Sequence, residues 1–323
     1  MKICTHKLMT LDFWRICISN CFLYLAVYLF LPLLPWLAVL YVEDDFNAAW
    51  GYILLALGMI AIGPFHAWLG DTFKRKHVLM LSTLFVGICI GGLMLANNAL
   101  QYYLLCLAIG FSFGIATTAG ITVSIDITES HRRSPGNRMY ALSGMLGMLL
   151  GCFAGMLVAA LFGVQSLFYG AMICIVISLI ADAGIYVAFR APVGVSKLNL
   201  DRFFLPLAWM PALNLAVGSF SVGTMTYHLL SHIGGWILIP VLAILIVPLT
   251  RMFVKLSHHQ QRGTANTTLQ LSVQTGWLLG MAFSVWSFEL KYALTACAIS
   301  LSVAVFTYII VTLPYYRKNR VRP

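Results

Sequence analysis

The chain of 323 residues is strongly apolar and carries a net positive charge. Hydrophobic residues make up 61% of it, charged residues only 9%, and the formal net charge is +10. A typical soluble domain has about 25% charged residues, and a domain of this length needs a polar surface to dissolve in water. The composition therefore excludes an ordinary water-soluble fold and predicts an all-α integral membrane protein.

Apolar runs long enough to cross a bilayer follow one another along the chain. The run 203–254 is divided in two, because one straight helix of that length would greatly overshoot a bilayer about 30 Å thick. The first run is too long for the apolar core of a cleavable signal peptide, so we expect it to remain as a membrane span. We predict about ten transmembrane helices, near residues 13–41, 48–70, 77–97, 100–125, 137–162, 166–189, 203–228, 234–254, 264–287 and 291–315.

The basic residues gather on one side of this predicted topology. Of the 20 Lys and Arg residues, 19 fall on one side of the membrane and Lys291 alone falls on the other. The positive-inside rule places the basic side in the cytoplasm, together with the N- and C-termini. We therefore expect a multi-pass protein of the cell inner (plasma) membrane, and we interpret the charge as a topology signal rather than as evidence of a nucleic-acid partner.

Two titratable side chains fall inside predicted spans, where ionisable groups are costly and are functional-site candidates. His66 lies in the second span and could sense protons, although it could also be a packed histidine. Asp182 lies in the sixth span and could couple proton movement, although it could also be a protonated or snorkelling residue near the inner interface. Both are candidates for proton coupling.

The loop between the second and third spans has an unusual pattern of charge. Asp71 lies at the C-terminal end of its predicted helix, where the macrodipole disfavours an anion, and Lys74, Arg75 and Lys76 follow it. We expect a nearby cation or the N-terminus of another helix to compensate Asp71. The alternative is ordinary positive-inside charge with one incidental acid.

This loop resembles the cytoplasmic signature of the major facilitator superfamily, which runs roughly Gly-x-Leu-Ala-Asp-Arg-x-Gly-Arg-Arg. Four residues fall on the pattern: Leu69, Asp71, Arg75 and Lys76. Three depart from it: Ala67, Thr72 and Lys74. Segment 126–136 resembles the loop that joins helices 4 and 5 in bacterial members, and segment 262–268 resembles the entry to helix 11. The resemblance implies a gating role for Asp71, Arg75, Lys76, Asp126, Arg133 and Arg262. Asp126 is expected to pair with Arg132 or Arg133 rather than to contact substrate.

The resemblance implies a secondary transporter of two six-helix halves built from inverted repeats. Here we expect an N-terminal half of six helices in residues 1–190, a cytoplasmic linker in 191–202 and a shortened half of four helices in 203–323. The equivalents of helices 8 and 9 are expected to be absent. The implied function is transport of a small organic solute or drug by alternating access, coupled to protons and carried out by a monomer within the lipid bilayer. Alternatives are a non-transporting shortened relative and a ten-helix drug/metabolite-type transporter.

The resemblance also suggests which polar residues line a substrate cavity. Asn20 and Asn214 belong to the spans that line the central cavity in the family, although each could instead bond a neighbouring helix. Gln274 stands where related sequences often carry an acid, and it keeps hydrogen bonding without the ability to carry a proton. The glycines at 144, 147, 151 and 155 predict one smooth helix face, for tight packing or for sliding between the halves.

No pattern predicts an enzyme, a cofactor or a metal site. None of the eight cysteines has the spacing of metal ligands. His228 and His232 stand four residues apart, but no third ligand accompanies them. The sequence also lacks a Walker loop, a nucleotide-binding fingerprint and a Ser/His/Asp set, which argues against a primary pump and against most membrane enzymes.

Overall fold

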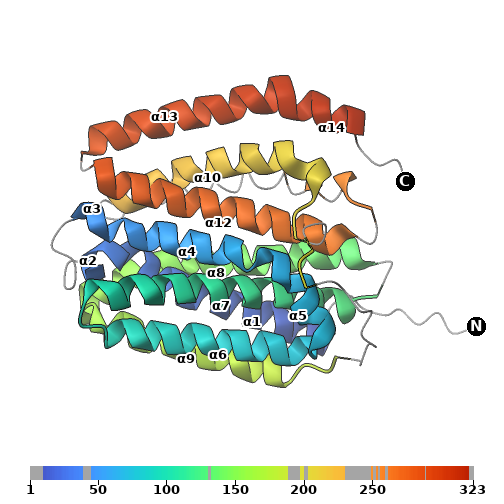
Figure 1. Cartoon of the computed structure of the whole chain (residues 1–323), viewed down its shortest axis with the longest axis horizontal. Helices are drawn as coiled ribbons and strands as arrows, with labels where there is room; N and C mark the ends of the chain where they lie inside the picture. The colour runs from blue at the N-terminus through green and yellow to red at the C-terminus, as the bar shows by residue number, and fades with distance from the viewer. Residues whose placement is uncertain are drawn as a thin grey trace, which may run out of the picture.

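The computed structural model consists of helices and their connections in the residues that it describes. These residues are 10–38, 45–129, 132–187, 197–199, 203–229, 249, 252–253, 255–258, 261–287 and 289–319. The long helices lie side by side and run roughly along one direction (Figure 1). The prediction of an all-α membrane bundle is confirmed.

The six spans predicted before residue 190 all coincide with helices. Short turns of 3-10 helix interrupt the first two spans at prolines, as expected where a ring removes a backbone donor. The elements are α1 (Leu11–Phe30), η1 (Leu31–Leu33), α2 (Leu34–Ala38), α3 (Asp45–Ala48), α4 (Trp50–Ala61), η2 (Gly63–Phe65), α5 (His66–Thr72), α6 (Arg75–Met94), α7 (Ala99–Asp126), α8 (Arg133–Phe162) and α9 (Gln165–Ala183). Helix α9 ends at Ala183, before the predicted end at residue 189, so Asp182 lies in its last turn.

Three of the four later spans also coincide with helices. The elements are η4 (Pro206–Ala208), α10 (Trp209–Leu229), α12 (Arg262–Ser287), α13 (Leu290–Thr307), the π-helical turn η7 (Tyr308–Thr312) and α14 (Leu313–Asn319). The predicted span 234–254 lies outside the described residues apart from positions 249 and 252–253. The predicted lack of two helices therefore stays a prediction, as do the boundaries at 190 and 203. Among the described helices, seven spans are long and apolar enough to cross a membrane.

The helices pack in two groups that meet along α12. In the N-terminal group, α1 packs against α8 and α9, α7 against α4 and α6, and α6 against α9. In the C-terminal group, α10 packs against α12 and α13. Helix α12 also contacts α4, α7 and α8, so it forms the described interface between the two groups.

The glycine face of α8 confirms the prediction of tight helix packing. A Cβ atom at Gly147 would overlap the carbonyl oxygen of Cys21, and one at Gly155 would overlap that of Leu29, both in α1. Because α1 and α8 belong to the same group, this face is not the sliding surface between halves that we considered. Close backbone packing recurs within the C-terminal group, where Gly276 of α12 lies against α10.

Helix α1 begins and α14 ends at the same end of the bundle, where α5 also lies (Figure 1). The last turn of α14 adds Arg317 and Lys318 to that end. The α13 helix, which carries Lys291 in its first turn, begins at the opposite end (Figure 1). These elements agree with the predicted one-sided distribution of basic residues.

Candidate functional site at the interface of the two helix groups

One face of α12 carries polar side chains into the interface between the groups. Asn266, Gln270 and Gln274 recur every four residues, a spacing that places them on one side of a helix. Their exposed fractions are 7%, 8% and 2%. Sequence analysis identified Gln274 but missed Gln270, although a four-residue amide repeat in a predicted span was a visible signal.

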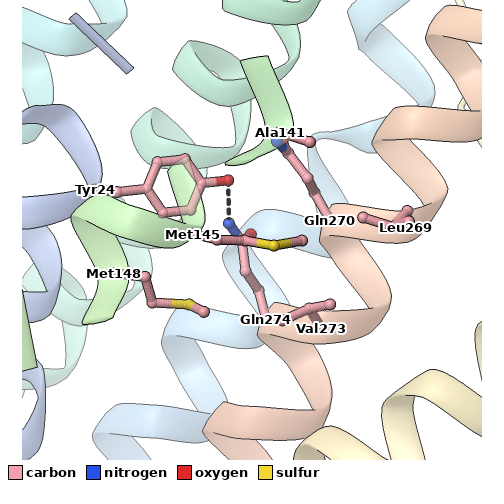
Figure 2. Close-up of a pocket in the computed structure, with 8 residues that line it drawn as sticks. All are labelled: Tyr24, Ala141, Met145, Met148, Leu269, Gln270, Val273 and Gln274. Atoms are coloured by element: carbon pink, nitrogen blue, oxygen red, sulfur yellow. Dashed lines mark hydrogen bonds between the residues drawn. The ribbon is translucent and has the colours of Figure 1, made fainter. Parts of the chain in front are cut away.

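A first cavity lies between α12 and the α1 and α8 helices. Tyr24 and Met145 line it opposite Gln270 and Gln274, which extend from α12 toward them (Figure 2). Nε2 of Gln274 donates a hydrogen bond of 2.6 Å to the Tyr24 hydroxyl, across the two helix groups. The empty volume of this cavity is about 260 Å³, part of which is open to the outside.

A second cavity shares the same two glutamines. His66 lines it from α5, with Thr118 of α7 and with Phe203, which precedes η4. Nε2 of His66 lies 3.1 Å from the Thr118 hydroxyl, a hydrogen-bonding distance. The empty volume is again about 260 Å³, part of it open to the outside. Among the described residues that line the two cavities, one is a histidine, His66, and none is an acid, a lysine or an arginine.

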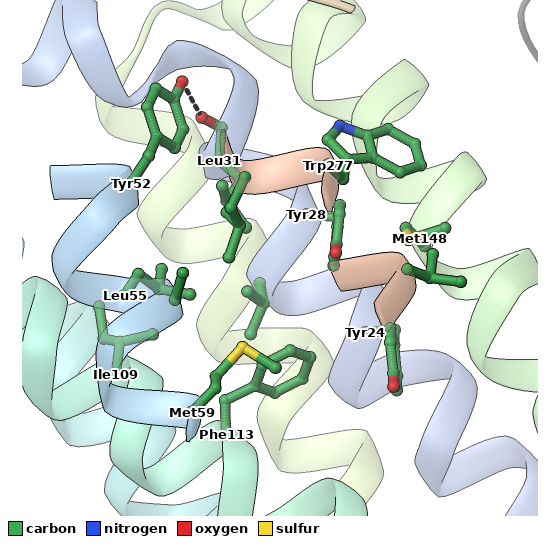
Figure 3. Close-up of a cluster of buried hydrophobic side chains, with 14 of the residues drawn as sticks. Tyr24, Tyr28, Leu31, Tyr52, Leu55, Met59, Ile109, Phe113, Met148 and Trp277 are labelled. Atoms are coloured by element: carbon green, nitrogen blue, oxygen red, sulfur yellow. Dashed lines mark hydrogen bonds between the residues drawn. The ribbon is translucent and has the colours of Figure 1, made fainter. Parts of the chain in front are cut away.

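Aromatic side chains pack between the groups on the side of the cavities away from α5. The rings of Tyr28 and Trp277 meet edge to face, with centroids 5.6 Å apart (Figure 3). Trp50 of α4 and Trp286 of α12 meet in the same way at 6.2 Å. This part of the interface therefore consists of apolar side-chain contacts.

The signature loop is anchored by a short ion pair. Nη1 of Arg75 lies 2.6 Å from Oδ2 of Asp126, and the Asp126 side chain is only 5% exposed. Nε of Arg75 also donates to the carbonyl oxygen of Gly70 at 3.2 Å. The partner of Asp126 in this ion pair is Arg75, which the sequence analysis did not suggest, and the expected pairing of Asp126 with Arg132 or Arg133 stays a prediction. The pair joins the α5–α6 connection to the end of α7.

The other gating candidates lie near the same end of the bundle. Asp71 lies in the last turn of α5 and is partly exposed, and Arg133 begins α8 and is half-buried. Of Arg262 the structure describes only the backbone at the start of α12. Among these residues, the structure brings together Arg75 and Asp126 directly.

Lys76 and Arg15 neutralise the C-terminus of α9. Nζ of Lys76 donates to the carbonyl oxygens of Ala183 at 2.7 Å and Ile185 at 2.8 Å. Nη1 of Arg15 donates to the carbonyl oxygen of Gly184 at 2.6 Å. Cations at this position offset the negative end of the helix dipole. Lys76 therefore fixes α6 to α9.

Asp182 is fully buried between α9 and α1, with an exposed fraction of 0%. Its neighbours include Lys76 and Ser19, whose hydroxyl lies 2.9 Å from that of Ser178. Asp182 is not among the residues that line the two cavities. The Asp182 side chain is enclosed by other parts of the protein, whereas a snorkelling side chain would reach the membrane surface.

The two asparagines proposed for the cavity connect neighbouring helices. Nδ2 of Asn20 donates at 3.0 Å to both the Tyr140 carbonyl and the Ser143 hydroxyl in α8. Nδ2 of Asn214 donates to the Ala304 carbonyl at 2.7 Å and to a hydroxyl of α13 at 2.8 Å. Both asparagines therefore hydrogen-bond a neighbouring helix, and neither lines the two cavities.

Comparisons with known proteins agree on one family. A model described as Major Facilitator Superfamily matches residues 16–239. "Multidrug resistance protein MdtG" of Escherichia fergusonii is 30% identical over 177 residues, which cover 50% of this chain and 42% of that protein. The chain thus aligns with less than half of that relative's length.

Solved transporters share the fold. The human organic anion transporter MFSD10 (TETRAN) superposes with a TM-score of 0.55 and 16% identity over 95% of each chain. A mutant of the nucleoside transporter NupG superposes with a TM-score of 0.60 and 13% identity, covering 94% of this chain and 100% of that one. At these identities the likeness concerns the fold alone.

Proposed function

Because this chain belongs to the major facilitator superfamily, we propose that it is a secondary active transporter that moves a small organic solute or drug by alternating access. The observation that carries the proposal is the pair of cavities on the α12 face, between the helix groups. The family match also removes the drug/metabolite-type alternative, so a non-transporting relative is the remaining competitor. The multi-pass membrane location follows from the family, and we propose the plasma membrane with both termini in the cytoplasm.

The contrast between packing within and between the groups supports alternating access. Within each group, glycines bring helix backbones into contact, as at Gly147 and Gly276, and such contacts favour rigid units. Between the groups, the described contacts include aromatic ring contacts and the hydrogen bond from Gln274 to Tyr24. Side-chain contacts of this kind can separate while each group keeps its own core.

We assign gating to the signature loop. The Arg75–Asp126 pair and the bonds from Lys76 to the end of α9 hold the loop against α7 and α9. Release of these bonds would free the α5 end of the bundle, next to the cavity that His66 lines. Further candidates for this gating role are Asp71, Arg133 and Arg262.

For coupling, the geometry favours His66 over Asp182. His66 lines the second cavity with Gln270 and Gln274, so a proton on it would lie beside a bound solute. Asp182 faces the α1–α9 contact instead. A histidine that gains and loses a proton between the two sides of the membrane would suit proton-driven exchange.

Drug efflux is the transport activity that we would test first, since the curated relative is named for multidrug resistance. The purified chain is reconstituted into liposomes, a proton gradient is imposed, and flux of a fluorescent drug panel is recorded. We expect gradient-dependent flux of at least one compound, and we expect His66→Gln to abolish its dependence on the gradient. The control His258→Gln changes an exposed histidine outside the site and should behave as the wild type. Absence of flux for the whole panel, with the protein folded, would contradict the proposal.

A further inference from the structure

Three buried polar atoms on the α12 face have no hydrogen-bond partner among the described residues. They are Nδ2 of Asn266, Oε1 of Gln270 and Nε1 of Trp277. The exposed fractions of these side chains are 7%, 8% and 2%. Buried polar groups are nearly always hydrogen-bonded in folded proteins, so each exception requires an explanation.

The three groups lie along one side of α12. Gln270 follows Asn266 by four residues, and Trp277 follows Gln270 by seven, spacings that align side chains along a helix. Gln274 lies between them, and its amide is already bonded to Tyr24. The face thus offers an unpaired acceptor at Gln270, with an unpaired donor one turn before it and another two turns after it.

Among the described residues that line the two cavities beside Gln270, none is permanently charged. Its neighbours in the first cavity include Met145 and Met148, and in the second they include Met59 and Thr117. Neither cavity is lined by an acid, a lysine or an arginine among the described residues, and His66 is the one titratable group opposite α12 apart from the tyrosine hydroxyl. A cation placed here would lose its hydration without gaining a counter-charge, and an anion would gain one only while His66 is protonated.

We infer that this face of α12 binds an uncharged, partly apolar molecule that donates a hydrogen bond to Oε1 of Gln270, the one of the three unpaired atoms whose side chain lines both cavities. The inference names the substrate class of the transporter and therefore rests on the proposed function. Such a molecule satisfies the unpaired oxygen of Gln270 and places its apolar part against Met145 and Met148.

The size of the site agrees with a binding event that separates the helix groups. The enclosed part of each cavity has room for about one water molecule, far below the ~300–1,000 Å³ of typical small-molecule sites. Both share Gln270 and Gln274, so a shift of these two side chains joins them into one site. Movement of α12 away from α8 would widen the joined site further.

Matched fluorescent probes test the inference by direct binding to the purified full-length protein. The first probe, 7-amino-4-methylcoumarin, is uncharged and carries an N–H donor. The second, 7-dimethylamino-4-methylcoumarin, lacks the donor, and the third, 7-amino-4-methylcoumarin-3-acetic acid, is an anion at neutral pH. We expect the first to bind about tenfold more tightly than either of the others, the effect of one buried hydrogen bond or of an unbalanced charge.

Two variants locate the probe on α12. Gln270→Leu has a similar volume and removes an unpaired polar atom, so it should fold at least as well as the wild type. It should weaken binding of the amino probe about tenfold and leave the dimethylamino probe unchanged. Trp277→Phe keeps an aromatic ring beside Tyr28 at a residue that lines neither cavity, so it should leave binding of both uncharged probes unchanged. Gln165→Leu, an exposed glutamine at the start of α9, is the matched control.

The outcomes separate this inference from the proposed function. Preference for the acid, equal binding by Gln270→Leu, or no binding of any probe would overturn the inference, whatever the flux assay shows. Conversely, Gln270-dependent binding of the amino probe by a protein that moves no solute in liposomes would support the site and contradict transport.

Discussion

The hydrogen bond between Gln274 and Tyr24 is the polar contact that most directly joins the two helix groups, and it can be removed from either side. Tyr24→Phe deletes the hydroxyl that accepts from Nε2 of Gln274 at 2.6 Å. Gln274→Leu deletes the donor and keeps a similar volume. The double variant replaces both partners with apolar side chains. Together with the wild type, these proteins form a double-mutant cycle.

The magnitude follows from burial. Tyr24 is 3% exposed and Gln274 is 2% exposed, so either single substitution leaves a polar group unpaired away from water. Such a group costs about 1–3 kcal/mol, whereas removal of both partners is nearly neutral. We therefore expect each single variant to lose about 1–3 kcal/mol and the double variant to recover at least about 1 kcal/mol of that loss.

The assay is unfolding of the purified protein in mixed micelles, followed by tryptophan fluorescence during titration with dodecyl sulfate. Tyr103→Phe provides a control, because its hydroxyl donates to the Asn47 carbonyl at an exposed position and its loss should cost less than about 0.5 kcal/mol. Additive effects of Tyr24→Phe and Gln274→Leu, within about 0.5 kcal/mol, would refute the reasoning, because they would show that the two side chains do not interact.

Further substitutions test packing, gating and helix contacts. Gly147→Ala should destabilise the protein by about 1–3 kcal/mol, because its Cβ would overlap a carbonyl of α1. At the control position Gly91, an added Cβ would meet only one sulfur atom at 4.0 Å, so Gly91→Ala should stabilise the protein by up to about 1 kcal/mol through helix propensity. Unfolding in dodecyl sulfate compares the two variants. Asp126→Asn should weaken the bond to Arg75 and lower the free energy of unfolding by about 1–3 kcal/mol, and it should change liposome flux while the protein stays folded. Unchanged flux would contradict a gating role for the loop. Asn214→Leu should lose two hydrogen bonds to α13 and lower the free energy of unfolding by about 1–3 kcal/mol, with little change in probe binding. A tenfold loss of probe binding would instead indicate that Asn214 contributes to the cavity.

Local sequence patterns were sufficient for most of the helices. Apolar runs set their number and approximate limits, and nine of the ten predicted spans coincide with helices among the described residues. The sequence also predicted that Asp126 needs a cation beside it, because an acid at the C-terminal end of a helix is disfavoured by the helix dipole. Its partner, Arg75, stands 51 residues earlier, and no local rule connects the two positions.

The residues of the candidate site were harder to predict, because their roles depend on which helices meet. Asn20 and Asn214 belong to spans expected near the cavity, but each turns toward a neighbour in its own group. Gln274 turns the other way and meets Tyr24, 250 residues earlier. The orientation of a helix about its own axis decided these outcomes, and packing against α8, α10 and α13 sets that orientation.

Access to Gln270 from the two sides of the membrane tests the account most directly. A single cysteine at position 270, in a protein whose eight native cysteines are replaced by alanine or serine, is reacted in liposomes with a membrane-impermeant thiol reagent from one side and then from the other. We expect reaction from both sides, because alternating access exposes the α12 face in turn. Reaction from one side only, under every gradient applied, would contradict transport by this chain.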